Sequence, residues 1–214
     1  MSENALPDRL PGPGGVGLEA HWDVPPDPRG PVVVLCHPHP LYGGTMNVPL
    51  LRTVAARLAG AGCPVLRFNF RGVGRSGGSW TGGETASEDV AAAAAATGDA
   101  YPHLPLALVG WSFGAVAALR WQAQAGGVGA CAFIAPPVRP DLAPPLPRPE
   151  TLPAARRLFL IGDRDQFTAV EDLRAYAAAA GADLLVLPGS DHFFFGREAR
   201  VAGAIASHLT ATGV

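Results

Sequence analysis

The sequence predicts an α/β fold, in which a doubly wound, mostly parallel sheet of about seven strands carries helices on both faces. Short apolar runs alternate with helical periodicity from residue 16 onward, which is the order that a parallel sheet requires. Several of these runs, such as residues 32–36, are apolar without interruption, as in strands covered on both faces. Around Ser112, flanked by Gly110 and Gly114, one such run passes directly into a helix, because glycines permit the sharp turn.

Composition indicates one globular domain. The chain has 214 residues, of which 48% are hydrophobic and 16% charged, enough for a full core. We expect a single domain over residues 16–214, preceded by a loose, Pro- and Gly-rich lead-in over residues 1–15. The 16 basic residues are all Arg, and without Lys the chain can form neither a Schiff base nor a GK[ST] phosphate loop.

Charge and cysteine usage exclude further classes. The net charge is −2 with dispersed Arg, whereas a nucleic-acid partner requires a basic face. The three cysteines, Cys36, Cys63 and Cys131, lie in or beside apolar runs, which predicts buried thiols rather than a disulfide framework. No charged-then-apolar leader opens the chain, and no apolar run approaches the roughly 18 residues of a membrane helix. We expect a cytoplasmic protein without a membrane partner, and the oligomeric state is left open.

Taken in chain order, the first predicted strand covers residues 16–24, where alternating apolar and polar positions indicate a half-buried edge strand. Short, mainly apolar runs predict the other strands, over residues 32–36, 65–70, 106–109, 129–135, 157–161 and 184–187. Helices are predicted after the N-capping residues Asn47 and Thr85, and over residues 113–124, 168–180 and 197–210.

Two histidines follow the first buried strand, in the order His37, Pro38, His39, Pro40. Their spacing is compatible with a metal, but the prolines constrain the backbone and no Cys, Asp or Glu joins them locally, so no metal is predicted. A backbone N–H of this loop can instead complete an oxyanion hole. Since proline has no N–H, His39 and Leu41 are the nearest donors. The alternative is a rigid loop that only positions the next helix.

Residues 71–77 contain the G-x-G-x-x-G spacing of a dinucleotide site. That fingerprint requires a helix at its last glycine and an acidic residue after the following strand. Neither is present, because glycine, serine and threonine continue the loop as far as Thr85. We therefore predict no nucleotide and no other cofactor.

Ser112 lies in the pentapeptide Gly-Trp-Ser-Phe-Gly, which has the form of a nucleophile elbow. The helix that begins at Phe113 directs its N-terminal amides to the same place, so the Phe113 N–H can hold an oxyanion. Taken alone, the pentapeptide is also compatible with an ordinary strand-to-helix turn. Two later strands end in loops that carry Asp163 and Asp165, and then His192. Functional loops of such a sheet share its carboxyl edge, and the order Ser, Asp, His is that of an α/β-hydrolase triad.

Over residues 32–209 the chain resembles the small lidless α/β-hydrolases of bacteria related to dienelactone hydrolases. The motifs that carry the resemblance are residues 37–47, reading HPHPLYGGTMN, 69–76, reading NFRGVGRS, 110–114, reading GWSFG, and 191–194, reading DHFF. The resemblance implies an α/β-hydrolase fold without a cap domain, with Ser112 as nucleophile, His192 as base and, from its G-x-x-D spacing, Asp165 as the acid. Ser112 stands where dienelactone hydrolases have Cys.

The predicted function is hydrolysis of a small-molecule, short-chain carboxylic ester through an acyl-enzyme on Ser112. The oxyanion is held by the N–H groups of Phe113 and His39. Alternatives are an acyltransferase, or a thioesterase or amidase, with the same triad, and a non-catalytic ligand-binding scaffold.

Residues 136–153 follow the strand after the elbow helix and contain eight prolines, which cannot form a helical lid. An open, shallow cleft is therefore expected over Ser112. Aromatic residues beside the catalytic loops are its predicted walls, namely Tyr42, Trp111, Phe113, Phe167 and Phe193.

Overall fold

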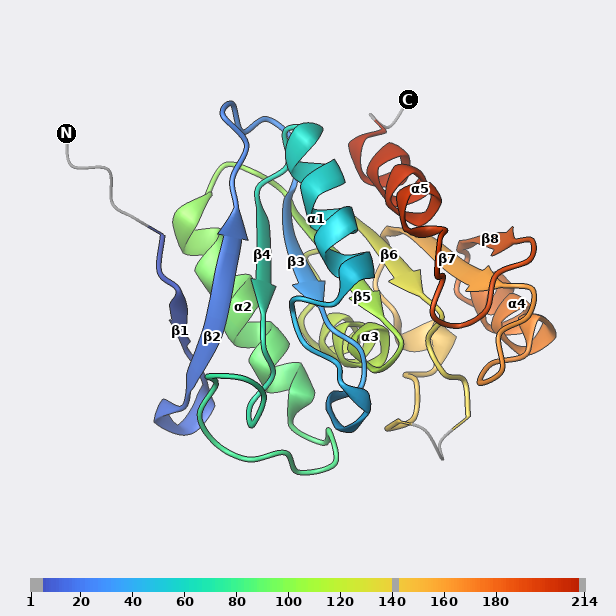
Figure 1. The fold of residues 1–214 in the computed structure, drawn as a ribbon, viewed down its shortest axis with the longest axis horizontal. Coiled ribbons are helices and arrows are strands. Elements are labelled where there is room, and N and C mark those ends of the chain that lie inside the picture. Colours follow the sequence, from blue (N-terminus) through green and yellow to red (C-terminus); the bar gives the residue numbers. More distant parts are fainter. Residues whose placement is uncertain (1–5, 140–142, 212–214) are drawn as a thin grey trace.

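A central sheet organises the structure, a computed structural model that describes residues 6–139 and 143–211 (Figure 1). Within these residues the sheet has eight strands in the order β1-β2-β4-β3-β5-β6-β7-β8. The strands are β1 (Arg9–Pro11), β2 (Gly17–Asp23), β3 (Val32–Cys36), β4 (Val65–Phe68), β5 (Leu106–Trp111), β6 (Ala130–Ile134), β7 (Arg156–Gly162) and β8 (Asp183–Leu187). Neighbouring strands from β4 to β8 in this order are parallel. β2 pairs antiparallel with both of its neighbours, β1 and β4. The predicted mostly parallel sheet is confirmed.

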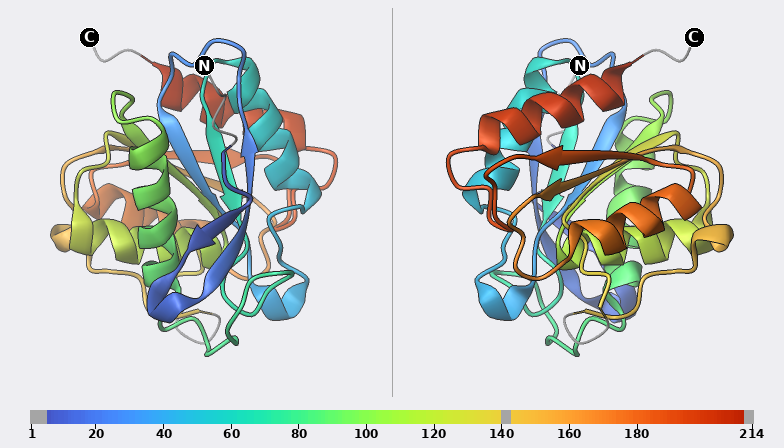
Figure 2. Two further views of the ribbon diagram at one scale, coloured as in Figure 1. Left: turned by 90° about the vertical axis from the view of Figure 1, so that its left-hand side faces the viewer. Right: turned by 90° about the vertical axis from the view of Figure 1, so that its right-hand side faces the viewer.

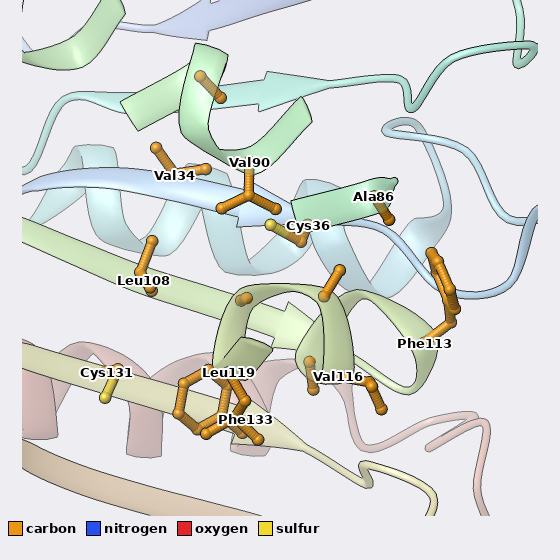
Figure 3. Close-up of a cluster of buried hydrophobic side chains, with 14 of the residues drawn as sticks. Val34, Cys36, Ala86, Val90, Leu108, Phe113, Val116, Leu119, Cys131 and Phe133 are labelled. Carbon is orange, nitrogen blue, oxygen red and sulfur yellow. The ribbon is translucent and has the colours of Figure 1, made fainter. Parts of the chain in front are cut away.

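Helices cover both faces of this sheet, as Figure 2 shows. They are α1 (Pro49–Gly60), α2 (Ala86–Ala100), α3 (Phe113–Ala125), α4 (Val170–Ala179) and α5 (Glu198–Thr210). α1 and α5 share one face, and α2, α3 and α4 the other. Strand side chains alternate between the two faces of a sheet, so β3 contributes to both apolar layers. Val33 packs in the layer of α1 and α5. Val34 packs against α2 and α3 (Figure 3).

The N-terminal edge differs from the prediction. Residues 9–11, expected to belong to a loose lead-in, form β1, and Leu10 is buried in the core. β2 therefore lies between β1 and β4 and is not an edge strand. A three-residue strand is too short to show the alternation by which strands are recognised in a sequence.

Neither of the two predicted helix caps forms a side-chain capping hydrogen bond. α1 begins two residues after Asn47, whose Oδ1 accepts a hydrogen bond of 2.9 Å from the buried Arg67. Thr85 precedes α2 without a side-chain cap, and Glu88, its expected capping-box partner, pairs with Arg71 at 3.0 Å. Arg67 of β4 and Arg71 in the loop after β4 therefore outcompete local capping at the two helix starts.

The loops after β3, β5, β7 and β8 all leave the carboxyl ends of parallel strands, and this edge holds the residues of interest. The segment after β6 contributes one turn of 3₁₀ helix, Pro149–Thr151, and no α-helix in its described parts, 136–139 and 143–153. The predicted absence of a cap domain agrees with this, although residues 140–142 lie outside the described chain. Within the described ranges, no helix is both long enough and apolar enough to cross a membrane.

Candidate active site

Ser112 occupies a sharp turn between β5 and α3. Its φ is 54° and its ψ is −120°, a strained conformation for a residue with a side chain. The flanking glycines are sterically required. A Cβ at Gly110 would lie 2.6 Å from the backbone of Ala115, and one at Gly114 would lie 2.4 Å from the carbonyl oxygen of Cys36. These close approaches bring the start of α3 against the end of β3 and leave the Ser112 side chain projecting at the sheet edge.

A hydrogen-bonded chain connects Ser112 to two side chains from other loops. The hydroxyl of Ser112 lies 2.9 Å from Nε2 of His192, and Nδ1 of His192 lies 2.8 Å from Oδ2 of Asp165. With the proton on Nδ1, the imidazole donates to the carboxylate and accepts from the hydroxyl. His192 is 5% exposed and the Asp165 side chain is fully buried, so little water competes for these contacts.

The two carboxylates of the loop after β7 have different partners. The second oxygen of Asp165 accepts the N–H groups of Phe167 and Thr168, at 2.9 Å and 3.0 Å. Asp163 instead accepts the N–H of Gly189 at 2.7 Å and so joins its loop to the one after β8. Of the two, only Asp165 is in hydrogen-bond contact with His192.

The backbone of His192 is also held from both sides. The indole Nε1 of Trp111 donates to the carbonyl oxygen of His192 at 3.2 Å, and the His192 N–H donates to the side-chain oxygen of Gln166 at 3.3 Å. Gln166 was not singled out by the sequence, since a polar loop residue carries no pattern. The two contacts fix the position from which the imidazole projects.

The sequence offered two backbone N–H groups in the loop after β3, those of His39 and Leu41, and only one of them is without a partner in the described chain. The Leu41 N–H donates to Nδ1 of the His39 side chain at 3.2 Å, so it is already engaged. Among the residues that the structure describes, the N–H groups of His39 and Phe113 have no protein acceptor. The approach of Gly114 to the end of β3 sets this loop against the start of α3, with the rings of His39 and Phe113 5.5 Å apart. Of the two N–H groups that the sequence offered in this loop, only that of His39 remains free to donate within the described ranges.

His37 is a buried structural histidine. Its Nε2 accepts the Phe70 N–H at 3.1 Å, and its Nδ1 donates to the Pro38 carbonyl oxygen at 2.7 Å. Burial lowers the pKa of His37 to about 4, so the ring is neutral near pH 7. The Pro38 carbonyl belongs to the same planar peptide as the His39 N–H. The His37 side chain therefore fixes the direction of that N–H.

Because His37 is buried neutral, it should make stability depend on pH. Its pKa in the folded chain, about 4, is below the ordinary 6.5, so the unfolded chain binds the proton more tightly. The stability is present above pH 6.5 and is lost as pH falls toward 4, by roughly 2 kcal/mol between pH 7 and pH 5. Urea unfolding of the wild type and His37→Asn at both pH values measures this, and the variant should show a shallower dependence. Equal slopes would assign the acid sensitivity to other groups.

The predicted cleft walls divide into two sets. Tyr42, Phe167 and Phe193 are 84%, 37% and 39% exposed, so their side chains are accessible to a substrate. Trp111 and Phe113 are 7% and 1% exposed, and their prediction as walls is wrong. Both side chains pack in the apolar layers on either face of the sheet, because side chains directly before and after the turn point into the core.

The structure also bears on two other sequence patterns, the glycine-rich loop at residues 71–77 and the paired histidines at 37 and 39. The glycine-rich loop at residues 71–77 folds around carboxylates of the chain itself: the Arg71 N–H donates to Asp89 at 3.0 Å and the Arg75 N–H to Glu19 at 2.7 Å. These amides are thus engaged by carboxylates rather than directed at a phosphate. Across the described ranges, no three His, Cys, Asp or Glu side chains gather in a way that could hold a metal ion.

Comparison with known proteins gives a consistent picture. The family model described as "Serine aminopeptidase, S33", one of the hydrolases, matches residues 27–185, well over half of the chain. A Xanthomonas campestris protein, XC6422, described as an α/β serine hydrolase without lid, is 30% identical over 96% of this chain and 95% of its own, with a TM-score of 0.80. The chain belongs to the lidless α/β serine hydrolases.

Two further structures place this lidless serine hydrolase among its neighbours. An α/β serine hydrolase homologue from Coxiella burnetii is 29% identical over 94% of this chain and 95% of its own, with a TM-score of 0.82. The esterase Pf2001 of Pyrococcus furiosus is 20% identical over 94% of this chain and 90% of its own, with a TM-score of 0.75, a likeness of fold alone. The predicted small lidless α/β-hydrolase family is confirmed.

Proposed function

We propose that this serine hydrolase is a carboxylesterase that cleaves short-chain esters through an acyl-enzyme on Ser112. The observation that carries the proposal is the continuous hydrogen-bonded chain from Ser112 through His192 to Asp165. In the first step His192 takes the Ser112 proton while the oxygen attacks the ester carbonyl. Asp165 holds the imidazole in the tautomer that can accept that proton, and stabilises the imidazolium that forms.

The negative oxygen of the tetrahedral intermediate is assigned to the N–H groups of Phe113 and His39. Phe113 is the first residue of α3, so its N–H adds the positive end of the helix dipole. The His39 peptide is held by the buried His37 and needs no reorganisation as charge develops. Collapse of the intermediate expels the alcohol, which receives the proton from His192. A water molecule, deprotonated by His192, then releases the acid and regenerates Ser112.

Two features favour an ester and water as reactants. Two side chains beside His192 are aromatic: Phe167 and Phe193 have ring centroids 4.8 Å and 5.7 Å from the imidazole. They offer apolar contact to an uncharged part of a substrate. The strongly exposed Tyr42 indicates an edge open to solvent, where water can reach an acyl-enzyme. The esterase Pf2001 shows that this architecture accommodates ester cleavage.

Acyl-chain length tests the proposal. The described segment after β6 has no α-helix to cover Ser112, so an extended acyl chain remains in water and forgoes roughly 0.8 kcal/mol of binding for each CH₂. For p-nitrophenyl esters we expect kcat/KM to be highest between acetyl and hexanoyl, and to fall toward palmitoyl. The amount of free acid released, measured by titration, should equal the amount of nitrophenol released.

A smooth hyperbolic dependence on substrate concentration is also expected, without a rise when the ester forms micelles. A maximum at palmitoyl, or activation at a lipid surface, would show that a part of this chain covers the site. Nitrophenol release without free acid in the presence of an added alcohol would identify an acyltransferase instead.

A further inference from the structure

Three phenylalanine rings form an exposed row beside His192. Phe167 follows β7, whereas Phe193 and Phe195 follow β8, and their exposed fractions are 37%, 39% and 74%. The rings of Phe167 and Phe193 lie 6.2 Å apart, and Phe195 stacks on Phe193 at 5.7 Å with an interplanar angle of 23°. We call these three residues the phenylalanine row.

The backbone after β8 is built to present this row. Phe194, between its two exposed members, is fully buried and has a φ of +55°, which costs energy in a residue with a large side chain. Oδ1 of Asp191 accepts the N–H groups of both Phe193 and Phe194 at 3.0 Å. The loop therefore anchors one phenylalanine in the core and holds its two neighbours outward. Contiguous exposed apolar surface of this kind marks a binding site.

The chemistry of ester cleavage determines which part of the substrate meets the row. When the C–O bond breaks, the leaving oxygen must lie within hydrogen-bond distance of His192 Nε2, which returns to it the proton taken from Ser112. Groups attached to that oxygen consequently lie next to the imidazole. Phe167 and Phe193 contact the imidazole edge to face, at 4.8 Å and 5.7 Å. By contrast, His39 and Tyr42 follow β3, and Phe113 begins α3 just after β5.

From this placement we infer that the phenylalanine row is the binding subsite for the leaving alcohol, and that it selects esters of aromatic alcohols. The inference rests on the proposed esterase function. Acylation forms the bond between Ser112 Oγ and the acyl carbon, breaks the bond to the leaving oxygen, and transfers the Ser112 proton through His192 to the released alcohol. No other reactant is required. An aromatic alcohol can pack edge to face or offset on such rings, whereas methanol cannot.

Two isomeric esters separate the leaving-group side from the acyl side. Benzyl acetate carries its ring on the alcohol, and methyl phenylacetate carries it on the acyl group. For the wild type we expect a higher kcat/KM with benzyl acetate. Phe193→Ala should lower kcat/KM for benzyl acetate about tenfold more than it lowers kcat/KM for methyl acetate. Phe193→Leu, which retains apolar bulk, should recover part of the loss.

The rate of deacylation gives a readout that a general structural defect would change. Every acetate ester forms the same acetyl-enzyme, and the alcohol has left before that intermediate is hydrolysed. A fall in the deacylation rate after a burst with p-nitrophenyl acetate therefore measures damage to the triad, and in Phe193→Ala it should be much smaller than the loss of kcat/KM for benzyl acetate. Val24→Ala, which truncates an exposed apolar side chain next to β2 at the opposite side of the sheet, serves as the control and should leave the ester preference unchanged.

Different outcomes would contradict the alcohol subsite and the proposed esterase function. A parallel loss for benzyl acetate and methyl acetate, or a loss confined to methyl phenylacetate, would overturn the assignment of the row to the alcohol while esterase activity persists. A wild-type enzyme that forms no acetyl-enzyme with any of these esters would overturn the proposed function itself.

Discussion

Replacing Ser112 with Ala should abolish ester turnover while the fold remains intact. The hydroxyl is the only atom group removed, and its contact is the 2.9 Å hydrogen bond to His192. The residues of a triad act as a unit, and loss of the nucleophile costs on the order of 10⁶ in kcat. The measurement is hydrolysis of p-nitrophenyl acetate at saturating substrate, together with a thermal unfolding curve. Because loss of one hydroxyl at this partly exposed turn removes little packing, we expect a melting temperature close to that of the wild type.

Ser190→Ala is the matched control for this experiment. Ser190 precedes His192 by two residues, is 2% exposed, and within the described chain its hydroxyl has no hydrogen-bond partner. Its removal should leave turnover within about twofold of the wild type, since no satisfied bond is broken. A fluorophosphonate probe should label the wild type and Ser190→Ala, but not Ser112→Ala. Turnover by Ser112→Ala within tenfold of the wild type would refute the assignment of the nucleophile.

The parallel part of the fold was predictable because its strands are covered on both faces. Apolar runs such as residues 32–36 and 158–161 are typical of strands buried on both faces, and the structure has β3 and β7 there. β1 was missed because three residues carry no periodicity. The caps at Asn47 and Thr85 were wrong because long-range contacts, formed by Arg67 and Arg71, cannot be read from local sequence.

The candidate site shows the same division between local and long-range information. The turn at Ser112 follows from Gly110 and Gly114, since each glycine removes a clash with backbone. The contact of His192 with Asp165 was anticipated from motif spacing and strand order. The burial of Trp111, by contrast, depends on which layer it meets. The engagement of the Leu41 N–H likewise depends on a side-chain rotamer two residues away, which no periodicity encodes.

Asp165→Asn should lower kcat by roughly 10³ to 10⁴, because the imidazole loses the partner that orients it. The hydrogen bonds at this position explain why an amide cannot substitute for the carboxylate. One oxygen faces Nδ1 of His192, and the other accepts the N–H groups of Phe167 and Thr168. All three partners are donors when His192 has its working tautomer. Whichever way the introduced amide turns, its NH₂ meets a donor, so either the tautomer or the loop is disturbed.

Asp163→Asn provides the comparison within the same loop. Oδ1 of Asp163 accepts a single N–H, that of Gly189 at 2.7 Å, and the amide oxygen of asparagine can accept it equally well. We therefore expect kcat within about threefold of the wild type, since a neutral acceptor retains the hydrogen bond. Measuring kcat alongside the melting temperature separates a defect in the site from a loss of folding, because the kcat of a folded Asp165→Asn enzyme reports on the site. If Asp163→Asn were the more damaging change, the orienting carboxylate would be Asp163. The observed contact of Asp165 with His192 would then have to be replaced by another arrangement when substrate binds.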